Sequence, residues 1–201
     1  MNPHPFYDTA AEIVQLPPPE RHAQLAALHS RSLAAYQAVL RRLTEADSRQ
    51  RLSSGDDART VAQIVGHIAE WDRFSMLGAL DILVGVDPPR TINDLSGYIE
   101  PDGRRIDFDS VDAFNAYQAE KHSRWAWADL QALALDTAST LHALFVHPAL
   151  LHASRLEATR RAPLHLENGV TIPDVAVGWK LWILVIEHMM VDHVQELGID
   201  L

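Results

Sequence analysis

The sequence predicts an all-α protein, a four-helix bundle with a long crossover after the second helix. Three observations support this fold class. Apolar residues recur at helical spacing in four long segments, patterns typical of strands are scarce, and two long irregular connections separate the segments. A chain of 201 residues is long enough for one well-buried core, so we expect a single helical domain over residues 1–201.

The first helix is expected from Glu20 to Asp47. Residues 1–19 are interpreted as an irregular N-terminal segment that ends at three consecutive prolines. After them, apolar side chains fall on one helical face, and Ser, Gly and Asp residues in the string SRQRLSSGDD then interrupt the pattern. The residues of that face are Leu25, Leu28, Tyr36, Val39, Leu40 and Leu43.

The second helix is expected to begin at Thr60 and to reach Gly85. Thr60 and Gln63 have the spacing of a capping box, in which two side chains satisfy each other's free backbone N–H groups. Helical periodicity is then lost from Val86 to Phe108, where prolines and glycines are frequent. This connection is long enough to cross the bundle, which would make the second and last helices antiparallel.

The third helical region begins at Asp109 or Ser110 as N-cap and extends to Phe145. It is interpreted as one bent helix or two helices, with a break near Trp125 and Trp127. A loop follows, and the string LHLENGVTI within it can form a small β-hairpin around Asn168-Gly169.

The last helix is expected from Pro173 to Leu197. Its apolar face contains His193, whereas Lys180 and Glu187 are interpreted as the solvent side. Trp179 and Trp182 on that face are interpreted as packing residues. Other apolar residues lie away from this face, so the helix is either central or covered by a partner subunit. These residues are Leu181, Leu184, Val185 and Val191.

Composition excludes several classes of protein. The chain has no Cys, which excludes disulfides, thiolate metal sites and a Cys nucleophile. Seventeen basic against 27 acidic residues give a net charge of −10, which argues against nucleic-acid or anionic-membrane partners. No signal peptide is visible, and the most apolar stretch, from Val175 to Val191, contains charged residues. We therefore expect a cytoplasmic protein.

Histidine is abundant, with 11 residues, and is the only residue type present that suits a transition metal well. His67 shares a helical stripe with two aromatic residues, and His193 lies on the apolar face of the last helix. In antiparallel helices, these two imidazoles would lie at a similar depth. His188 precedes His193 by five residues, which places it about 140° away around a regular α-helix. The other histidines considered have no common spacing and are expected at the surface or in loops: His142, His147, His152 and His165.

Two motifs resemble the DinB/YfiT-like superfamily. The string TVAQIVGHIAEWDRF is similar to the second helix of that family, and HVQELG after His193 is similar to the end of its last helix. The resemblance implies a four-helix bundle, often dimeric, with a divalent metal held by one His of the second helix and two of the last. It also implies a relationship to thiol-dependent transferases and isomerases.

His67 and His193 match this pattern, but the third position departs from it. The family usually spaces its last two histidines four apart, and position 189 is Met. Two alternatives follow. A π-bulge would add one residue to a turn and bring His188 and His193 onto one face. In a regular helix, Met189 would fill the ligand position and the site would be weak or metal-free.

The leading hypothesis is a metal-dependent enzyme, a hydrolase or a thiol-dependent transferase, that acts on a small molecule. Its divalent ion, zinc or nickel, would be bound by His67, His193 and, in a bulged helix, His188. Any thiol must be an external cosubstrate, and a homodimer is expected. Glu187 and Asp192 are possible partners for the histidines. The alternative is a metal-free bundle that binds a small apolar ligand or acts as a dimerisation module.

Overall fold

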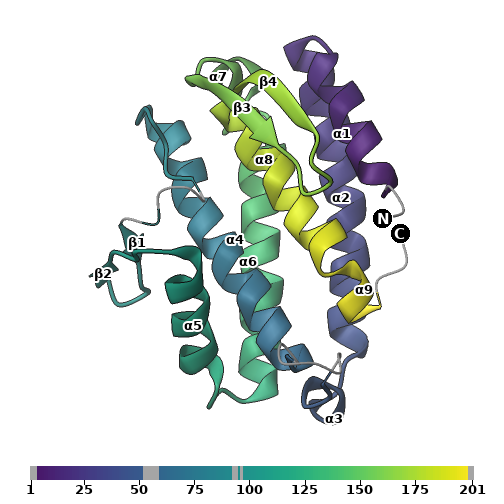
Figure 1. Ribbon diagram of the computed structural model, residues 1–201, viewed down its shortest axis with the longest axis vertical. Coiled ribbons are helices and arrows are strands. Elements are labelled where there is room, and N and C mark those ends of the chain that lie inside the picture. Colours follow the sequence, from purple (N-terminus) through teal and green to yellow (C-terminus); the bar gives the residue numbers. More distant parts are fainter. Residues whose placement is uncertain (1–3, 52–58, 92–94, 96, 199–201) are drawn as a thin grey trace.

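The fold is all-α with two small β-hairpins, in agreement with the sequence-based expectation (Figure 1). A computed structural model describes residues 4–51, 59–91, 95 and 97–198. Its elements are α1 (Pro5–Gln15), α2 (Pro18–Arg42), α3 (Glu45–Ser48), α4 (Val61–Val84), β1 (Tyr98–Ile99), β2 (Arg105–Ile106), α5 (Val111–His122), α6 (Trp127–Val146), α7 (Ala153–Glu157), β3 (Arg161–His165), β4 (Thr171–Ala176), α8 (Val177–Glu187), the π-helix η1 (His188–Asp192) and α9 (Val194–Leu197).

The four long helices α2, α4, α6 and α8 form the bundle. Both α6 and α8 contact α2 and α4, and α5 packs against α4 on its outer side (Figure 1). The connection from α4 to α6 contains the β1–β2 hairpin and α5, so it forms the expected long crossover. Helices α4 and α8 run in opposite directions, which brings the beginning of α4 close to the end of the last helical segment (Figure 1).

Local sequence signals predicted several helix boundaries correctly. Thr60 and Gln63 form the capping box: the Thr60 N–H donates to Gln63 Oε1 at 2.8 Å, and the Gln63 N–H donates to Thr60 Oγ1 at 3.2 Å. The helix ends at Gly85, whose φ of 84° is left-handed and suits glycine. Ser110 caps α5, and the third helical region is interrupted between α5 and α6, which begins at Trp127. The Trp127 indole N–H donates to the Leu43 carbonyl.

The N-terminal segment was predicted incorrectly as irregular. Pro5 occupies the first turn of α1, and the His4 side chain accepts the N–H of Phe6, so the helix start is capped. The apolar residues of α1 follow helical spacing and are buried. They are Phe6, Tyr7, Ala10, Ile13 and Val14. The sequence analysis overlooked this pattern because it began the first helix only after the three prolines.

Two further boundaries differ from the expectation. The first long helix begins at Pro18, because proline is tolerated in a first helical turn, and it ends at Arg42. Thr44 and Asp47 then form their own capping box, which starts the separate helix α3. The last helix does not begin at Pro173, since that residue lies in β4, paired with β3 in the expected hairpin.

Helix α8 is central, which explains why it is apolar around its whole circumference. Leu181 and Val185 are buried in the core, and α1, α7 and the β3–β4 hairpin cover the helix within the chain (Figure 1). Lys180 and Glu187 are buried too, contrary to the expectation of a solvent side. The Lys180 ammonium donates to the Pro163 carbonyl, so the hairpin supplies a polar partner that the sequence pattern could not show.

Trp179 and Trp182 serve as packing residues in the core, as expected. Both indoles are fully buried, and they stack against each other with ring centroids 6.2 Å apart. The Trp182 indole N–H donates to His29 Nδ1 at 3.0 Å, which satisfies its one polar atom. No described helix combines the length and the apolar character needed to cross a membrane.

Candidate metal centre

The helix after α8 is π-helical from His188 to Asp192, which is the first of the two alternatives left open by the sequence. A π-turn contains one more residue than an α-turn, so it can bring two residues five positions apart onto one face. Here the rings of His188 and His193 lie 4.8 Å apart between centroids. The irregular turn therefore joins two side chains that a regular helix would separate.

His67 completes the cluster from α4. Its Nε2 lies 3.2 Å from His188 Nε2, which in turn lies 3.3 Å from His193 Nε2. One ring nitrogen from each of the three histidines can act as a ligand, and these three atoms lie within 4.8 Å of one another. The structure thus brings together the three histidines that sequence analysis selected.

The environment favours neutral imidazoles, the form that binds metals. Burial lowers the pKa of His67 to about 3, and the nearby His193 and Arg59 act in the same direction. Burial, together with the other two histidines, also lowers the pKa of His188 well below its ordinary value. The pKa of His193 is lowered by burial, although Glu196 opposes the effect. All three residues are therefore unprotonated near pH 7.

Glu196 supports His193 from behind. Its Oε2 lies 2.5 Å from His193 Nδ1, and its Oε1 accepts from Arg59 at 3.2 Å. A carboxylate on Nδ1 fixes the ring orientation and leaves Nε2 free to act as a ligand. Sequence analysis named Glu187 and Asp192 for this role and missed Glu196. The available signal was the i,i+3 spacing within HVQELG.

Glu187 has a different partner in the structure. Its Oε1 accepts the Glu167 N–H at 3.0 Å, so this carboxyl connects the last helix to the β3–β4 hairpin. Burial, with the charges of Asp192 and Glu167, raises the pKa of Glu187 to about 7. Burial is also the main cause that raises the pKa of Asp192 to about 7.

The other histidines lie elsewhere, as expected. His142 bonds to Ser30 at 2.9 Å, and His147 accepts a backbone N–H within its own turn. His152 caps α7, and His165 bonds to Thr171 in the hairpin. Within the described ranges, none of these four residues joins the cluster of His67, His188 and His193.

Two cavities meet at His67. The first has a volume of about 230 Å³ and extends over His188 along α4 and α8, with a mainly apolar wall and several carboxyl groups. The second has a volume of about 340 Å³ and is polar. His67 and Asn115 line both cavities. The other residues of the polar cavity are Arg59, Gln63, Gln118 and Ala119.

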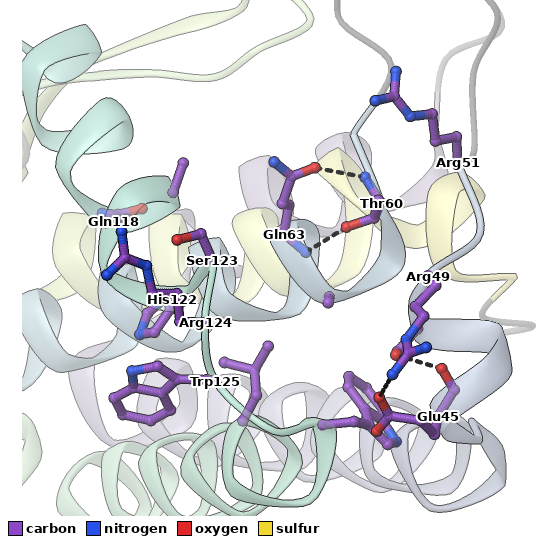
Figure 2. Close-up of a pocket in the computed structure, with 15 residues that line it drawn as sticks. Glu45, Arg49, Arg51, Thr60, Gln63, Gln118, His122, Ser123, Arg124 and Trp125 are labelled. Atoms are coloured by element: carbon purple, nitrogen blue, oxygen red, sulfur yellow. Dashed lines mark hydrogen bonds and ion pairs between the residues drawn. The ribbon is translucent and has the colours of Figure 1, made fainter.

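A third cavity, of about 450 Å³, continues from the polar one. Gln63, Gln118 and Ala119 line both of them. Figure 2 shows this third cavity with Arg49 and Arg51 on one side and Arg124 with Trp125 on the other. Several basic side chains therefore line the surface leading away from His67 in this direction, whereas no arginine lines the 230 Å³ cavity among the described residues.

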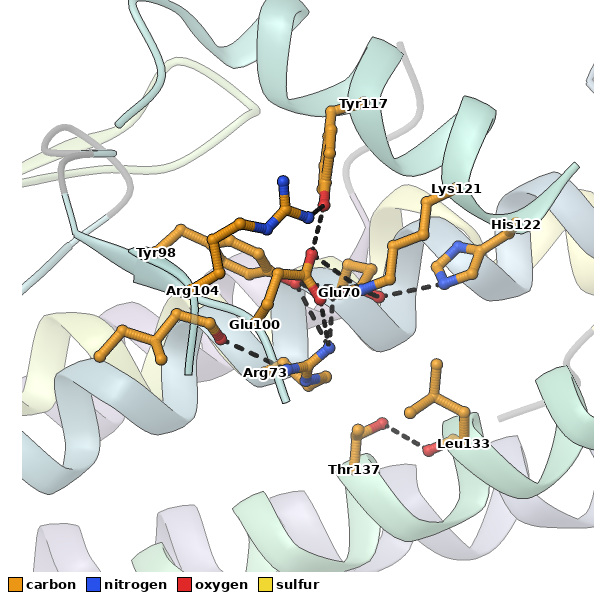
Figure 3. A network of polar contacts seen from close by, with 11 residues as sticks. Glu70, Arg73, Tyr98, Glu100, Arg104, Tyr117, Lys121, His122, Leu133 and Thr137 are labelled. Carbon is orange, nitrogen blue, oxygen red and sulfur yellow. Dashed lines mark hydrogen bonds and ion pairs between the residues drawn. The ribbon is translucent and has the colours of Figure 1, made fainter. Parts of the chain in front are cut away.

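Helix α5, which carries Asn115 and Gln118, is held on α4 by a buried ionic network (Figure 3). At its centre is Glu70, three residues after His67, with no solvent exposure. Its carboxylate pairs with Lys121 Nζ at 2.8 Å and with His122 Nε2 at 3.0 Å, and it accepts from the Tyr98 hydroxyl. This network fixes the wall of the polar cavity and was not anticipated from the sequence.

No family model matches the sequence, and a search of curated proteins found no match. Two solved structures are similar in fold: the crystal structure of the mycothiol-dependent maleylpyruvate isomerase and that of a histidine-to-alanine mutant of this enzyme. Each has a TM-score of 0.57 and 14% sequence identity over 98% of this chain. The fold is DinB/YfiT-like. The chain spans 64% of the length of one neighbour and 65% of the other.

Proposed function

We propose that this chain is a divalent-metal-dependent enzyme that acts on a small molecule with an external thiol as cosubstrate. His67, His188 and His193 would be the metal ligands. The observation that carries the proposal is the convergence of three neutral imidazole nitrogens at a π-helical turn. π-Turns are rare and recur at functional sites. The thiol is supported by the two structural neighbours, whose names describe a mycothiol-dependent isomerase.

The donor set fits zinc or nickel. Zinc holds imidazole nitrogens at about 2.0–2.1 Å in a tetrahedral arrangement, which separates two nitrogens by about 3.4 Å. Two of the three nitrogen pairs agree with this value: Nε2 of His188 lies 3.2 Å from that of His67 and 3.3 Å from that of His193. All three ligand nitrogens lie within 4.8 Å of one another. Three nitrogen ligands leave a position open for a water or a substrate. Imidazole suits zinc and nickel better than it suits magnesium or calcium, which prefer oxygen ligands.

When bound, such an ion supplies Lewis acidity and lowers the pKa of a coordinated water or thiol. The chain contributes the arrangement around it. Glu196 orients His193, and burial keeps all three imidazoles neutral. The polar cavity beside Gln118 suits the hydrophilic body of a low-molecular-weight thiol, and the 230 Å³ cavity suits a small substrate. Both cavities open on His67, so the two reactants would meet there.

Metal content tests the ligand assignment. The purified protein and a His67→Ala, His193→Ala double variant are dialysed against zinc or nickel, and bound metal is measured by inductively coupled plasma mass spectrometry. We expect about one ion per chain in the wild type and none in the double variant. His142→Ala is the matched control, since it removes a histidine outside the cluster. Equal, sub-stoichiometric metal in all three proteins would overturn the proposal.

A spectroscopic experiment tests the thiol. The protein is loaded with cobalt in place of zinc, and mycothiol or cysteine is added. Coordination of the thiol produces a near-ultraviolet thiolate-to-cobalt charge-transfer band, which we expect in the wild type and not in His188→Ala. Absence of the band at saturating thiol in the cobalt-loaded wild type would contradict thiol activation, while leaving the metal assignment to the preceding experiment.

A further inference from the structure

The 340 Å³ and 450 Å³ cavities together form a polar channel that leads away from His67, and its charge is opposite to that of the whole chain. The chain has 27 acidic and 17 basic residues. Among the described residues that line the channel, the charged side chains other than histidine are Arg49, Arg51, Arg59, Arg124 and Glu45. These arginines come from segments before α4, after α3 and after α5, so the fold gathers positive charge around the channel.

Most of this positive charge lacks a close carboxylate. Arg51 and Arg124 are exposed, and neither forms an ion pair with another described residue. Arg49 pairs with Glu45 at 2.5 Å, but both side chains are more than half exposed, so solvent weakens the attraction. An anion that enters the channel would therefore find guanidinium groups with free N–H donors.

The course of α4 sets the length of a molecule that fills the channel. Gln63, one turn before His67, lines both cavities, and Thr60 at the helix cap lines only the far one. Thr60 precedes His67 by seven residues, which corresponds to about 10 Å along the helix. Three amino-acid residues in extended conformation have the same length, about 10 Å.

The far end of the channel also has an aromatic wall. Figure 2 shows Trp125 beside Arg124 on one side and Arg49 on the other. The Trp125 ring is 41% exposed and contacts His122 edge-on, with centroids 4.8 Å apart. The other four tryptophans are at most 7% exposed, so Trp125 can report on a molecule bound in the channel.

We propose that the polar channel binds an elongated anionic molecule whose carboxylate or phosphate group meets Arg49, Arg51 and Arg124. A guanidinium group binds either anion through paired N–H donors. A cationic molecule would instead be repelled by the unpaired arginines. As a statement about the thiol cosubstrate, this inference rests on the proposed function, and it specifies a thiol about three residues long with an acidic group at its far end.

Two pairs of probes test this inference on protein treated with EDTA. S-Methylglutathione, which has two carboxylates, is compared with its diethyl ester, and 4′-phosphopantetheine is compared with pantetheine. Binding is measured by isothermal titration calorimetry at pH 7. In the pair that carries the right anion, we expect the anionic member to bind at least tenfold more tightly, with a preference that decreases as salt is added. Equal affinities within both pairs would overturn the proposal.

Arg49→Gln combined with Arg124→Gln removes a guanidinium group from each side of the channel. Both positions are exposed, so the double variant should fold like the wild type. It should bind the preferred anionic probe at least tenfold more weakly and leave the affinity for the esterified or unphosphorylated probe unchanged. Arg31→Gln, at an exposed position on α2 outside the channel, is the matched control and should change neither affinity. Unchanged binding of the anionic probe in the double variant would refute the assignment.

Acrylamide quenching of tryptophan fluorescence locates the bound probe. The anionic probe should protect the exposed Trp125 from acrylamide, and this protection should disappear in Trp125→Phe. Tight binding without protection would place the probe elsewhere and overturn the proposal.

Failure of this inference can be distinguished from failure of the proposed function. The calorimetry needs neither a metal nor a free thiol, because the protein is metal-free and the glutathione sulfur is methylated. Anion selectivity without the cobalt–thiolate band would refute thiol activation alone. A normal band without anion selectivity would refute this inference alone.

Discussion

The buried carboxylate of Glu70 allows a quantitative prediction for the substitution Glu70→Gln. Burial alone would raise the pKa of Glu70, but hydrogen bonds from His122, Lys121 and Tyr98 outweigh it and hold the pKa at about 2. The ordinary value is 4.5. At about 1.4 kcal/mol per pK unit, this difference corresponds to roughly 3 kcal/mol of stability at pH 7.

The sign of the pH dependence follows from the lowered pKa. The unfolded chain binds the proton near pH 4.5, whereas the folded protein resists it down to about pH 2. The contribution of Glu70 is therefore complete above pH 4.5 and is lost as the pH falls toward 2. Gln is isosteric but uncharged, so Glu70→Gln should be about 3 kcal/mol less stable at pH 7, and the deficit should shrink at pH 3.

Urea denaturation followed by circular dichroism measures both quantities. Glu45→Gln is the control, because the pair of Glu45 with Arg49 is exposed and should contribute less than about 0.5 kcal/mol. A deficit below about 1 kcal/mol for Glu70→Gln at pH 7 would refute the reasoning. So would a deficit of the same size at pH 7 and pH 3, since that result would assign the loss to packing and not to charge.

Three further predictions concern the core and the π-turn. Burial, together with His142, lowers the pKa of His29 to about 3, so the contribution of His29 to the free energy of unfolding is present above pH 6.5 and is lost as the pH falls toward 3. His29→Leu should therefore flatten the dependence of urea stability on pH between pH 7 and pH 4, and an unchanged slope would contradict this. Gly178→Ala would place a Cβ 2.8 Å from the Leu156 carbonyl oxygen, so thermal melting should show a loss of about 1–3 kcal/mol, and an unchanged melting temperature would be inconsistent with this packing. Deletion of Met190 would leave His188 and His193 four residues apart, a spacing that puts both on one face of a regular α-helix. We expect the zinc affinity of this variant to be within tenfold of wild type, and a complete loss of zinc binding would count against the ligand assignment.

Much of the fold could be predicted because its signals are local. The Thr60–Gln63 capping box and the Ser110 cap involve side chains and backbone groups three residues apart. The break before Trp127 and the hairpin around Asn168-Gly169 were also predicted correctly. The errors at Pro18 and Pro173 share a cause: proline is tolerated in a first helical turn, in a loop and in an edge strand, and only the neighbouring elements decide among these places.

The sequence by itself determined the class of fold, the absence of cysteine chemistry and the identity of the three candidate ligands. The tertiary structure decided how His188 and His193 meet, because a π-turn is unfavourable in isolation and depends on packing against α2. It also decided that Glu196 supports His193 and that Lys180 and Glu187 are buried. Helical periodicity identifies one apolar face, but the depth of a side chain depends on every element packed around it.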